Sequence, residues 1–431
     1  MRVLLTGANG FIGSAVLARL HEAGHEVVAV VRSGGAATKR LRAEQVVRLD
    51  LAAATRPEDW APHLTDIDAV VNCAGVLQDS PGNSTSGVHR DGVAALFAAC
   101  ERAGVRRVVH LSAIGADHQQ PTAFSRTKIE GDNLLMACDL DWVILRPSVV
   151  VGRPAFGGSA LFRGLASLPV LPVMPNTGPL QIVQLDDLTR TILFFLQLNA
   201  PARVALDVAG PERLSFTDAV RAYRTWLGWR EPRTLPIPAW LAHAIFRLGD
   251  FAGQLGWRPP VRSTAEREMV RGAVGDNSQW RRLAAIEPRS LSAALGAEPA
   301  SVQERWFSQL YFLKAVGFTV FALFWIATGV VSLGPGWEIG RGLMLEGGID
   351  EPLASLSVVA GALADIAIGL AIAFRRTARL GLYAALAISV SYMIIGTILL
   401  PRLWIEPLGP MLKIWPIMAF NLMLLAIRED R

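Results

Sequence analysis

The stretch RVLLTGANGFIG, residues 2–13, decides the fold of this chain. It opens with a short apolar run typical of a buried strand, and Gly7, Gly10 and Gly13 follow at three-residue spacing. Gly7 permits a tight turn, Gly10 lets the backbone approach a pyrophosphate, and Gly13 lets the next helix pack closely on the sheet. The stretch predicts a strand, a turn and a helix whose N-terminus faces the phosphates of a dinucleotide.

Apolar strands and helical stretches alternate along the next 140 residues or so. A helix with apolar residues at helical spacing is expected in SAVLARLHEAGH (14–25). Further strands are expected in EVVAVVRS (26–33), AVVNCAG (69–75), RRVVHLSAIGA (106–116) and WVILRPSVVVG (142–152). This alternation predicts an α/β fold, a doubly wound parallel sheet of the Rossmann type with helices on both faces.

The ends of these strands supply the expected cofactor contacts. Arg32 and Ser33 end the second strand, where an acidic residue would bind the ribose 2′-hydroxyl of NAD. A guanidinium suits a 2′-phosphate, so NADP is favoured over NAD, unless Arg32 simply points into solvent. Asp50 can meet the adenine amino group or cap the following segment. The full expected cofactor-binding set is Thr6, Gly7, Asn9, Gly10, Phe11, Ile12, Gly13, Arg32, Ser33, Asp50, Leu51, Cys73, Ala74, Gly75 and Lys128.

The three cysteines and the N-terminus bear on the compartment. Cys73, Cys100 and Cys138 are far apart in sequence, lie in apolar surroundings and lack metal-ligand spacing such as C-x-x-C. We interpret them as small core residues in a reducing compartment, and we expect no metal. The N-terminus runs directly into a strand without the shape of a signal peptide, so the first domain is expected in the cytoplasm.

Three segments are expected: a nucleotide-binding domain at 1–210, a substrate or lid subdomain with an amphipathic linker at 211–300, and a membrane domain at 301–431. PAWLAHAIFRLGDFAGQL (238–255) carries apolar residues three or four apart, which predicts an amphipathic helix. It can pack on the sheet domain, cover a substrate cleft or lie on the bilayer. Within 221–290, twelve arginines and no lysine stand against six acidic residues, which favours anionic lipid over nucleic acid as a partner. A solvated arginine-rich surface is the alternative.

Hydrophobic residues make up 52% of the chain, and the excess lies after about residue 306. Four runs reach membrane-spanning length, at about 307–333, 353–374, 378–400 and 408–427. RRTAR (375–379) joins the second run to the third, and the positive-inside rule places it in the cytoplasm. The sequence thus predicts a multi-pass protein of the inner membrane, with its N-terminal domain in the cytoplasm.

Polar residues within these runs are candidates for function. Asp365 lies in mid-span, with Gly361 and Gly369 on the same helix face, so it is expected to turn toward the bundle. Asn421 in the fourth run is expected at a depth similar to that of Asp365, and Lys413 lies two turns nearer the outside on roughly the same face as Asn421. A polar cluster of Asp365, Asn421 and Lys413 is expected, and a protonated Asp365 that only joins two helices is the alternative.

The order TGxxGxxG, Asp-Leu, Asn-x-Ala-Gly, a Ser after the next strand and then a Lys resembles the short-chain dehydrogenase/reductase superfamily. Over about residues 1–250 the chain is most similar to its extended and atypical branches, including the type found as an accessory subunit of respiratory complex I. The last 130 residues or so resemble the DoxX-like four-helix membrane family, most clearly in SYMIIGTILLPRLWIEPLGPMLKIWP (391–416).

The resemblance assigns the catalytic roles to Ser112 and Lys128. At the position where the family carries its catalytic Tyr, this chain has Phe124. Ser112 would hydrogen-bond a substrate carbonyl, and Lys128 would hold the nicotinamide ribose. Phe124 has no proton to give, and His118 is the nearest alternative donor in the sequence. Two interpretations remain open: an oxidoreductase that acts on a lipophilic substrate, and a non-catalytic NADP(H)-binding module for assembly, stability or redox sensing of a membrane complex. A nucleotide-gated transporter is a third.

Overall fold

The computed structural model describes residues 1–32, 41–80, 82–115, 122–257 and 259–428. The chain forms two compact units. The sheet unit comprises Met1–Phe251 and Pro259–Gln309, and the helical unit comprises Ala252–Arg258 and Leu310–Arg431. Each unit is described by itself.

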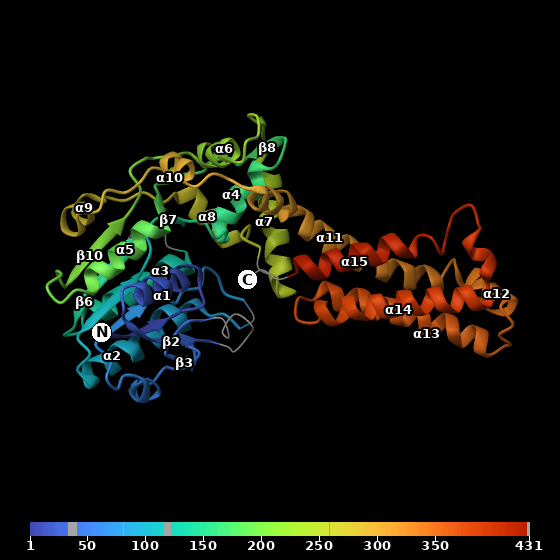
Figure 1. The fold of residues 1–431 in the computed structure, drawn as a ribbon, viewed down its shortest axis with the longest axis horizontal. Coiled ribbons are helices and arrows are strands. Elements are labelled where there is room, and N and C mark those ends of the chain that lie inside the picture. The colour runs from blue at the N-terminus through green and yellow to red at the C-terminus, as the bar shows by residue number, and fades with distance from the viewer. Residues whose placement is uncertain (33–40, 81, 116–121, 258, 429–431) are drawn as a thin grey trace. The chain divides into compact units, whose positions relative to one another are not determined.

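A parallel sheet of seven strands forms the centre of the sheet unit (Figure 1). Its spatial order is β10-β6-β5-β4-β1-β2-β3. The chain adds β2 and β3 on one side of β1 and then returns to add β4, β5, β6 and β10 on the other side. This confirms the predicted doubly wound fold. The strands are β1 (Arg2–Thr6), β2 (Glu26–Val31), β3 (Gln45–Arg48), β4 (Ala69–Asn72), β5 (Arg107–Leu111), β6 (Asp141–Pro147) and β10 (Val204–Val208).

Helices cover both faces of this sheet. Val3 and Leu5 of β1 belong to the core under α1 (Phe11–Glu22) and α5 (Leu185–Leu196), and Leu4 belongs to the core under α2 (Gly92–Ala103) and α3 (Ala123–Met136). Successive side chains of a strand point to opposite faces, so a strand made only of apolar residues contributes side chains to the cores on both faces of the sheet.

Short elements complete the sheet unit. β7 (Val149–Val151) pairs with β9 (Ile182–Gln184), and β8 (Val170–Val173) pairs with β11 (Arg233–Pro236). A π-helical turn, η4 (Gly87–Asp91), precedes α2, and 3₁₀ turns lie at Pro57–Asp59 and Ala61–His63. The remaining helices are α4 (Gly157–Ala166), α6 (Phe216–Trp226), α7 (Ala239–Gln254), α8 (Ser263–Arg271), α9 (Ser278–Ala284) and α10 (Leu291–Ala297).

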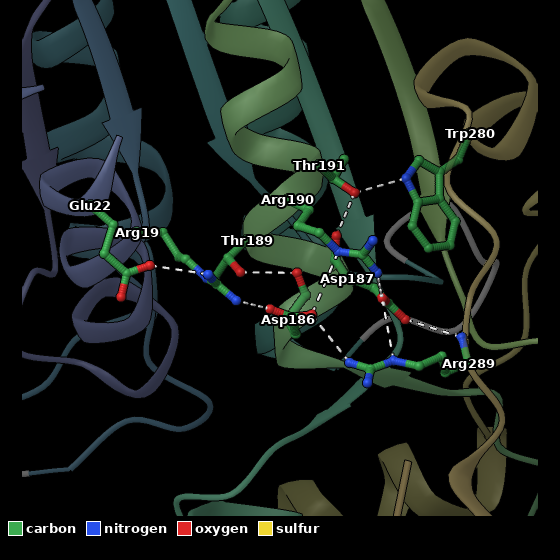
Figure 2. Close-up of polar contacts among 9 residues, drawn as sticks. All are labelled: Arg19, Glu22, Asp186, Asp187, Thr189, Arg190, Thr191, Trp280 and Arg289. Atoms are coloured by element: carbon green, nitrogen blue, oxygen red, sulfur yellow. Dashed lines mark hydrogen bonds and ion pairs between the residues drawn. The ribbon is translucent and has the colours of Figure 1, made fainter. Parts of the chain in front are cut away.

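The two aspartates at the start of α5 form ion pairs (Figure 2). Asp186 contacts Arg19 of α1 and Arg289, while Asp187 is fully buried and contacts Arg190. Neither aspartate caps the helix, since the residue before α5 is Gln184 and no side chain caps it. The carboxylates instead join α5 to α1 and to the chain after α9.

The helical unit contains three helices that are long and apolar enough to cross a membrane, within the residues described. They are α11 (Val302–Leu333), α13 (Leu353–Ala373) and α14 (Ala378–Leu399). α12 (Trp337–Glu346) lies between the first two, and a 3₁₀ turn, η5 (Pro401–Trp404), follows α14.

The helix found in the fourth expected span, 408–427, is shorter than the sequence predicts. This helix, α15, covers only Ile414–Ile427, which are 14 residues and about 21 Å at a rise of 1.5 Å per residue. Gly409 adopts φ +56 before Pro410, and this turn delays the start of the helix. α15 is therefore too short to cross a hydrocarbon core of about 30 Å by itself.

Asp365 turns into the bundle, as expected. It is 3% exposed and accepts a hydrogen bond from the Tyr392 hydroxyl at 3.1 Å. Asn421 is also buried, but its Nδ2 donates to the Leu382 carbonyl at 3.0 Å. Asp365 and Asn421 thus have separate partners, and together with Lys413 they do not form the predicted contact cluster.

Candidate cofactor and active site

The glycine turn lies between β1 and α1, at the point where the strand order reverses. Gly7 has φ +64, and a Cβ there would lie 2.9 Å from the Ala74 nitrogen. A Cβ on Gly13 would lie 2.1 Å from the Gly7 carbonyl oxygen. Gly10 precedes α1 without a side-chain cap, which leaves the first N–H groups of the helix available to an anion. Asn9 is exposed beside them, whereas Phe11 is buried.

A buried polar chain connects the ends of three neighbouring strands. The Thr6 hydroxyl contacts the Asn72 amide oxygen, which also accepts the Ala74 N–H at 3.2 Å. The Asn72 Nδ2 lies 2.8 Å from Nδ1 of His110. The predicted contact segment Cys73–Gly75 therefore lies directly beside the glycine turn. Burial raises the pKa of Cys73 to about 12, so its thiol is not a nucleophile at neutral pH.

Arg32 lies at the end of β2 and is held in place. Its Nη1 donates to Asn83 Oδ1 at 2.6 Å and to the Gly82 carbonyl at 3.1 Å. The guanidinium therefore contacts a loop and does not simply point into solvent. Both of these partners are neutral, so neither neutralises the cation. Ser33, its predicted companion, lies outside the described residues.

Asp50 and Leu51 follow β3 and take local roles in the structure. Asp50 Oδ1 accepts the Ala52 N–H at 3.1 Å, which is the capping role. Leu51 is 6% exposed and packs in the core under α2 and α3, so its side chain does not point to the cofactor turn. Any contact of Leu51 with a cofactor would come from its backbone.

Lys128 is buried beneath the nucleotide-binding edge. Its Nζ donates to the Leu111 carbonyl at 2.8 Å, and burial lowers its pKa to about 8. A Cβ on Gly75 would lie 3.6 Å from this Nζ and 3.7 Å from Nε2 of His89. Ser112, which follows β5, is buried, and its hydroxyl lies close enough to the buried Asp132 carboxylate to lower the pKa of that group against the effect of burial. The end of β5 and helix α3 thus bring the two predicted catalytic residues to one edge of the sheet.

Phe124 lies in the first turn of α3, beside a histidine that the sequence did not single out. The rings of Phe124 and His89 meet edge-on, with centroids 5.6 Å apart. His89 Nε2 accepts the Val76 N–H at 3.1 Å, so Nδ1 carries the proton toward Thr127 Oγ1 at 3.0 Å. Burial, followed by the charge of Lys128, lowers the pKa of His89 to about 2. His89 is therefore neutral and positions its neighbours. His118 lies outside the described residues.

A buried carboxylate lies behind Lys128. Asp132 has a side-chain exposure of 0%, and Nε of Arg146 lies 3.1 Å from its Oδ2. His110 Nε2 lies 3.6 Å from its other oxygen. Burial raises the pKa of Asp132, and it lowers the pKa of His110 well below the usual value. The charge of Asp132 acts on Lys128 and raises the pKa of that lysine against the larger effect of burial.

Helix α8 covers the start of α3, the helix that carries Phe124. Glu268 Oε1 accepts hydrogen bonds from the hydroxyls of Thr122 at 2.5 Å and Ser125 at 3.1 Å. Arg271 pairs with Glu268 at 2.5 Å and donates to Ser125 Oγ at 2.6 Å. It also reaches the carbonyl of Ile114, in the loop after Ser112, at 3.2 Å. We call Glu268 and Arg271 the α8 clamp.

The site brings together part of the predicted cofactor-binding set, and it lacks the hydroxyl expected for proton transfer. It offers a phosphate-binding turn, a cation at the end of β2 and a buried Lys128. The residue at the acid position, Phe124, carries no ionisable group. Lys128 follows Phe124 by one helical turn and Arg271 donates to the neighbouring Ser125 hydroxyl, and an arginine does not release its proton at ordinary pH.

Two family models match this chain. Residues 7–164 match the NAD(P)H-binding family, and residues 322–422 match the DoxX-like family. The chain thus joins an NAD(P)-binding Rossmann domain of the short-chain dehydrogenase/reductase kind to a DoxX-like domain. The DoxX-like match and the three long apolar helices point to membrane association.

Relatives in other organisms are distant. An uncharacterized protein of Mycobacterium tuberculosis is 28% identical over 216 residues, which are 50% of this chain and 22% of that protein. The ceramide reductase of Caulobacter vibrioides is 24% identical and is matched over 55% of this chain and 73% of its own. The photosystem II assembly factor Ycf39 of Synechocystis is 24% identical, and the match covers 51% of this chain and 66% of Ycf39.

Solved structures share the fold of the sheet unit. The UDP-glucuronic acid 4-epimerase of Bacillus cereus, bound to UDP-glucuronic acid and NAD, superposes with a TM-score of 0.54 at 20% identity. The match covers 72% of this chain and 100% of the epimerase. At this identity the likeness is one of fold, and it does not distinguish NADP from NAD for this chain.

Proposed function

We propose that this protein is a membrane-anchored NADP(H)-dependent oxidoreductase that acts on a lipophilic substrate. The observation that carries the proposal is the convergence of the glycine turn, Gly75 and buried Lys128 at one edge of the sheet. A dinucleotide laid along this edge would place its pyrophosphate at the turn and its nicotinamide end toward Lys128. The preference for NADP rests on Arg32, whose guanidinium contacts the neutral Gly82 carbonyl and Asn83 side chain and is not neutralised by them.

The bound cofactor would supply or accept a hydride, and the residues of this chain would do the rest. Ser112, buried at the end of β5, would donate its hydroxyl to a substrate oxygen. Lys128 would hold the ribose and lend a positive charge to the site. Because Phe124 gives no proton, a substrate whose reduced form tolerates a developing negative charge, such as a quinone or a conjugated carbonyl, suits the site best.

The lipophilic class of substrate is inferred from the membrane half of the chain. Three long apolar helices follow the nucleotide-binding unit in the same polypeptide, and one relative is named as a reductase of ceramide, which is a lipid. Anchoring brings an enzyme to substrates that stay in the bilayer. We place the N-terminal unit in the cytoplasm of a cell whose inner membrane holds the helices, because RRTAR (375–379) obeys the positive-inside rule there.

The test uses the full-length protein in lipid nanodiscs. NADPH oxidation is followed by the absorbance of the reduced cofactor. The substrates are a panel of quinones and lipophilic carbonyl compounds. Turnover that disappears in Lys128→Ala supports the proposal. Tight NADPH binding without any turnover across the panel would exclude an oxidoreductase.

A second candidate function is a non-catalytic NADP(H)-binding module in a membrane complex. Two observations favour it: Phe124 at the acid position and the α8 clamp over the start of α3. One relative, Ycf39, is named as an assembly factor. For this candidate, NADPH binding should alter the co-purification of membrane proteins, and Lys128→Ala should weaken that effect without any loss of turnover.

A further inference from the structure

Helix α7 carries apolar side chains on two opposite faces. One face packs inside the sheet unit, where Ala242 and Phe246 are buried. Gly249 on this face has no space for a side chain, since a Cβ there would lie 1.7 Å from the Val261 carbonyl oxygen. Asp250 at its edge accepts hydrogen bonds from Gln78 Nε2 at 2.9 Å. This face accounts for the packing of α7 in the sheet unit.

The opposite face is exposed. Trp240, Leu248 and Phe251 are 72%, 67% and 58% exposed. At about 100° per residue they lie along one side of the helix, opposite Ala242 and Phe246. We call these three residues the α7 stripe. Isolated exposed apolar residues are ordinary, but several large ones along one side of a helix indicate an interaction site.

The chain after α7 indicates what covers the stripe. Leu255 and Trp257 belong to the helical unit. The Trp257 indole N–H donates to the carbonyl of Ala373, the last residue of α13, at 2.8 Å. The Arg375 N–H donates to the Leu255 carbonyl at 3.1 Å. The end of α7 is thus tied to the end of a helix of spanning length, where hydrocarbon gives way to headgroups.

The charges near this point match an anionic surface. Arg247 lies beside the α7 stripe and donates to His243 at 3.2 Å. The connection that receives the end of α7 holds Arg375, Arg376 and Arg379. Apolar side chains flanked by arginines are the pattern of a helix that lies in the interface of a bilayer, with its cations at the headgroups.

We propose that α7 is an interfacial helix whose stripe of Trp240, Leu248 and Phe251 inserts among the headgroups of the cytoplasmic leaflet and prefers anionic lipid. The inference rests on the proposed membrane anchoring. It adds a lipid-binding surface that lies outside the spanning helices. A reaction on a lipid would then take place beside a helix already in contact with the leaflet that holds it.

The experiment places a fluorescent label on α7 of the full-length protein. Cys73, Cys100 and Cys138 are replaced by Ala, and a single cysteine is introduced as Leu248→Cys or, as the matched control off the stripe, His243→Cys. Each labelled protein is reconstituted in nanodiscs of phosphatidylcholine, with or without phosphatidylglycerol. Quenching by lipids brominated near the headgroup is then measured for both positions.

We expect quenching at position 248 to exceed that at position 243 by about twofold or more, and to rise with phosphatidylglycerol. Equal quenching at the two positions in protein that stays in the bilayer would overturn the inference and leave the anchoring intact. A label at 248 that is shielded from water but not quenched, with cross-linking between copies, would assign the stripe to a protein interface. Release of the protein from the membrane by alkaline carbonate would overturn the anchoring itself, and the inference with it.

Discussion

The ring of Phe124 meets the imidazole of His89 edge-on, with centroids 5.6 Å apart and an angle of 78° between the rings. Both nitrogens of His89 are engaged, by the Val76 N–H and by Thr127 Oγ1. Phe124 therefore occupies an ordered position next to the cofactor edge. The position of the missing acid is thus filled by an aromatic ring that packs on His89, while the first turn of α3 is capped by the Thr122 side chain.

Restoring the hydroxyl is the most direct probe of this position. Phe124→Tyr keeps the ring and adds a proton donor in the first turn of the helix that carries Lys128. General acid catalysis contributes about 10²–10⁴-fold, so we expect NADPH-dependent turnover to rise within that range. Phe124→Leu serves as the control and should not gain activity. If the tyrosine variant binds NADPH normally and stays as slow as the wild type, the cleft is not shaped for a substrate that needs this proton.

The choice of cofactor should depend on Arg32. Arg32→Asp places a carboxylate where a 2′-phosphate would lie, and it should reverse the preference from NADPH to NADH. The measurement is thermal stabilisation of the full-length protein by each dinucleotide. Asn83→Ala, which removes one partner of the guanidinium, is the control and should retain the preference. A larger shift with NADH in the wild type would contradict the NADP assignment.

The affinity for NADPH should fall in mildly alkaline solution. Burial lowers the pKa of Lys128 to about 8, so its ammonium is present below that pH and is lost above it. The affinity should therefore be constant near pH 7 and weaken as the pH rises through about 8. Titrations between pH 6.5 and about 9.5 test this. In Lys128→Arg the charge persists, and a pH dependence unchanged from the wild type would assign the effect to another group.

The α8 clamp should contribute to the stability of the sheet unit. Arg271→Ala removes the cation from Glu268 and a donor from Ser125 Oγ. Leaving partly buried polar groups without partners costs about 1–3 kcal/mol, so the unfolding temperature should drop by several degrees. The control is Arg267→Ala, an exposed arginine on the same helix. Equal midpoints for the two variants would show that the clamp is not structural.

The contact between α13 and α11 should not tolerate a side chain at Gly369. A Cβ there would lie 2.7 Å from the Ala322 carbonyl oxygen, so Gly369→Ala must displace one helix. We expect a cost of about 1–3 kcal/mol in a denaturation assay in detergent. Gly342→Ala is the matched control, because a Cβ at Gly342 meets no atom within 4 Å. Similar stabilities would argue against close packing of these helices.

Local patterns made much of the sheet unit predictable. The glycine turn depends on residues within one strand and one turn, and the alternation of strands and helices repeats at short range. The membrane-length runs are also local features of composition. The fourth run was overestimated because apolar composition continues through the turn at Gly409 and Pro410, where the helix has not yet begun.

The residues around the acid position could not be predicted in the same way. His89 lies in a π-helical turn 35 residues before Phe124, and the α8 clamp is more than 140 residues after Ser125 in the sequence. Glu268 and Arg271 appear in the sequence only as charges on an arginine-rich stretch. Their approach to Ser125 depends on how α8 packs on the start of α3, and periodicity carries no signal of that.

The sequence by itself determined that this protein has a dinucleotide turn, a lysine without its tyrosine and a set of membrane-length helices. Spacing and composition suffice for these features, because each one depends on residues of a single strand, turn or helix. Only the tertiary structure decided that Phe124 packs against His89, that α8 covers the start of α3 and that α7 exposes a second apolar stripe. Those relationships come from contacts between segments far apart in the chain, where burial and hydrogen-bond geometry select the partners.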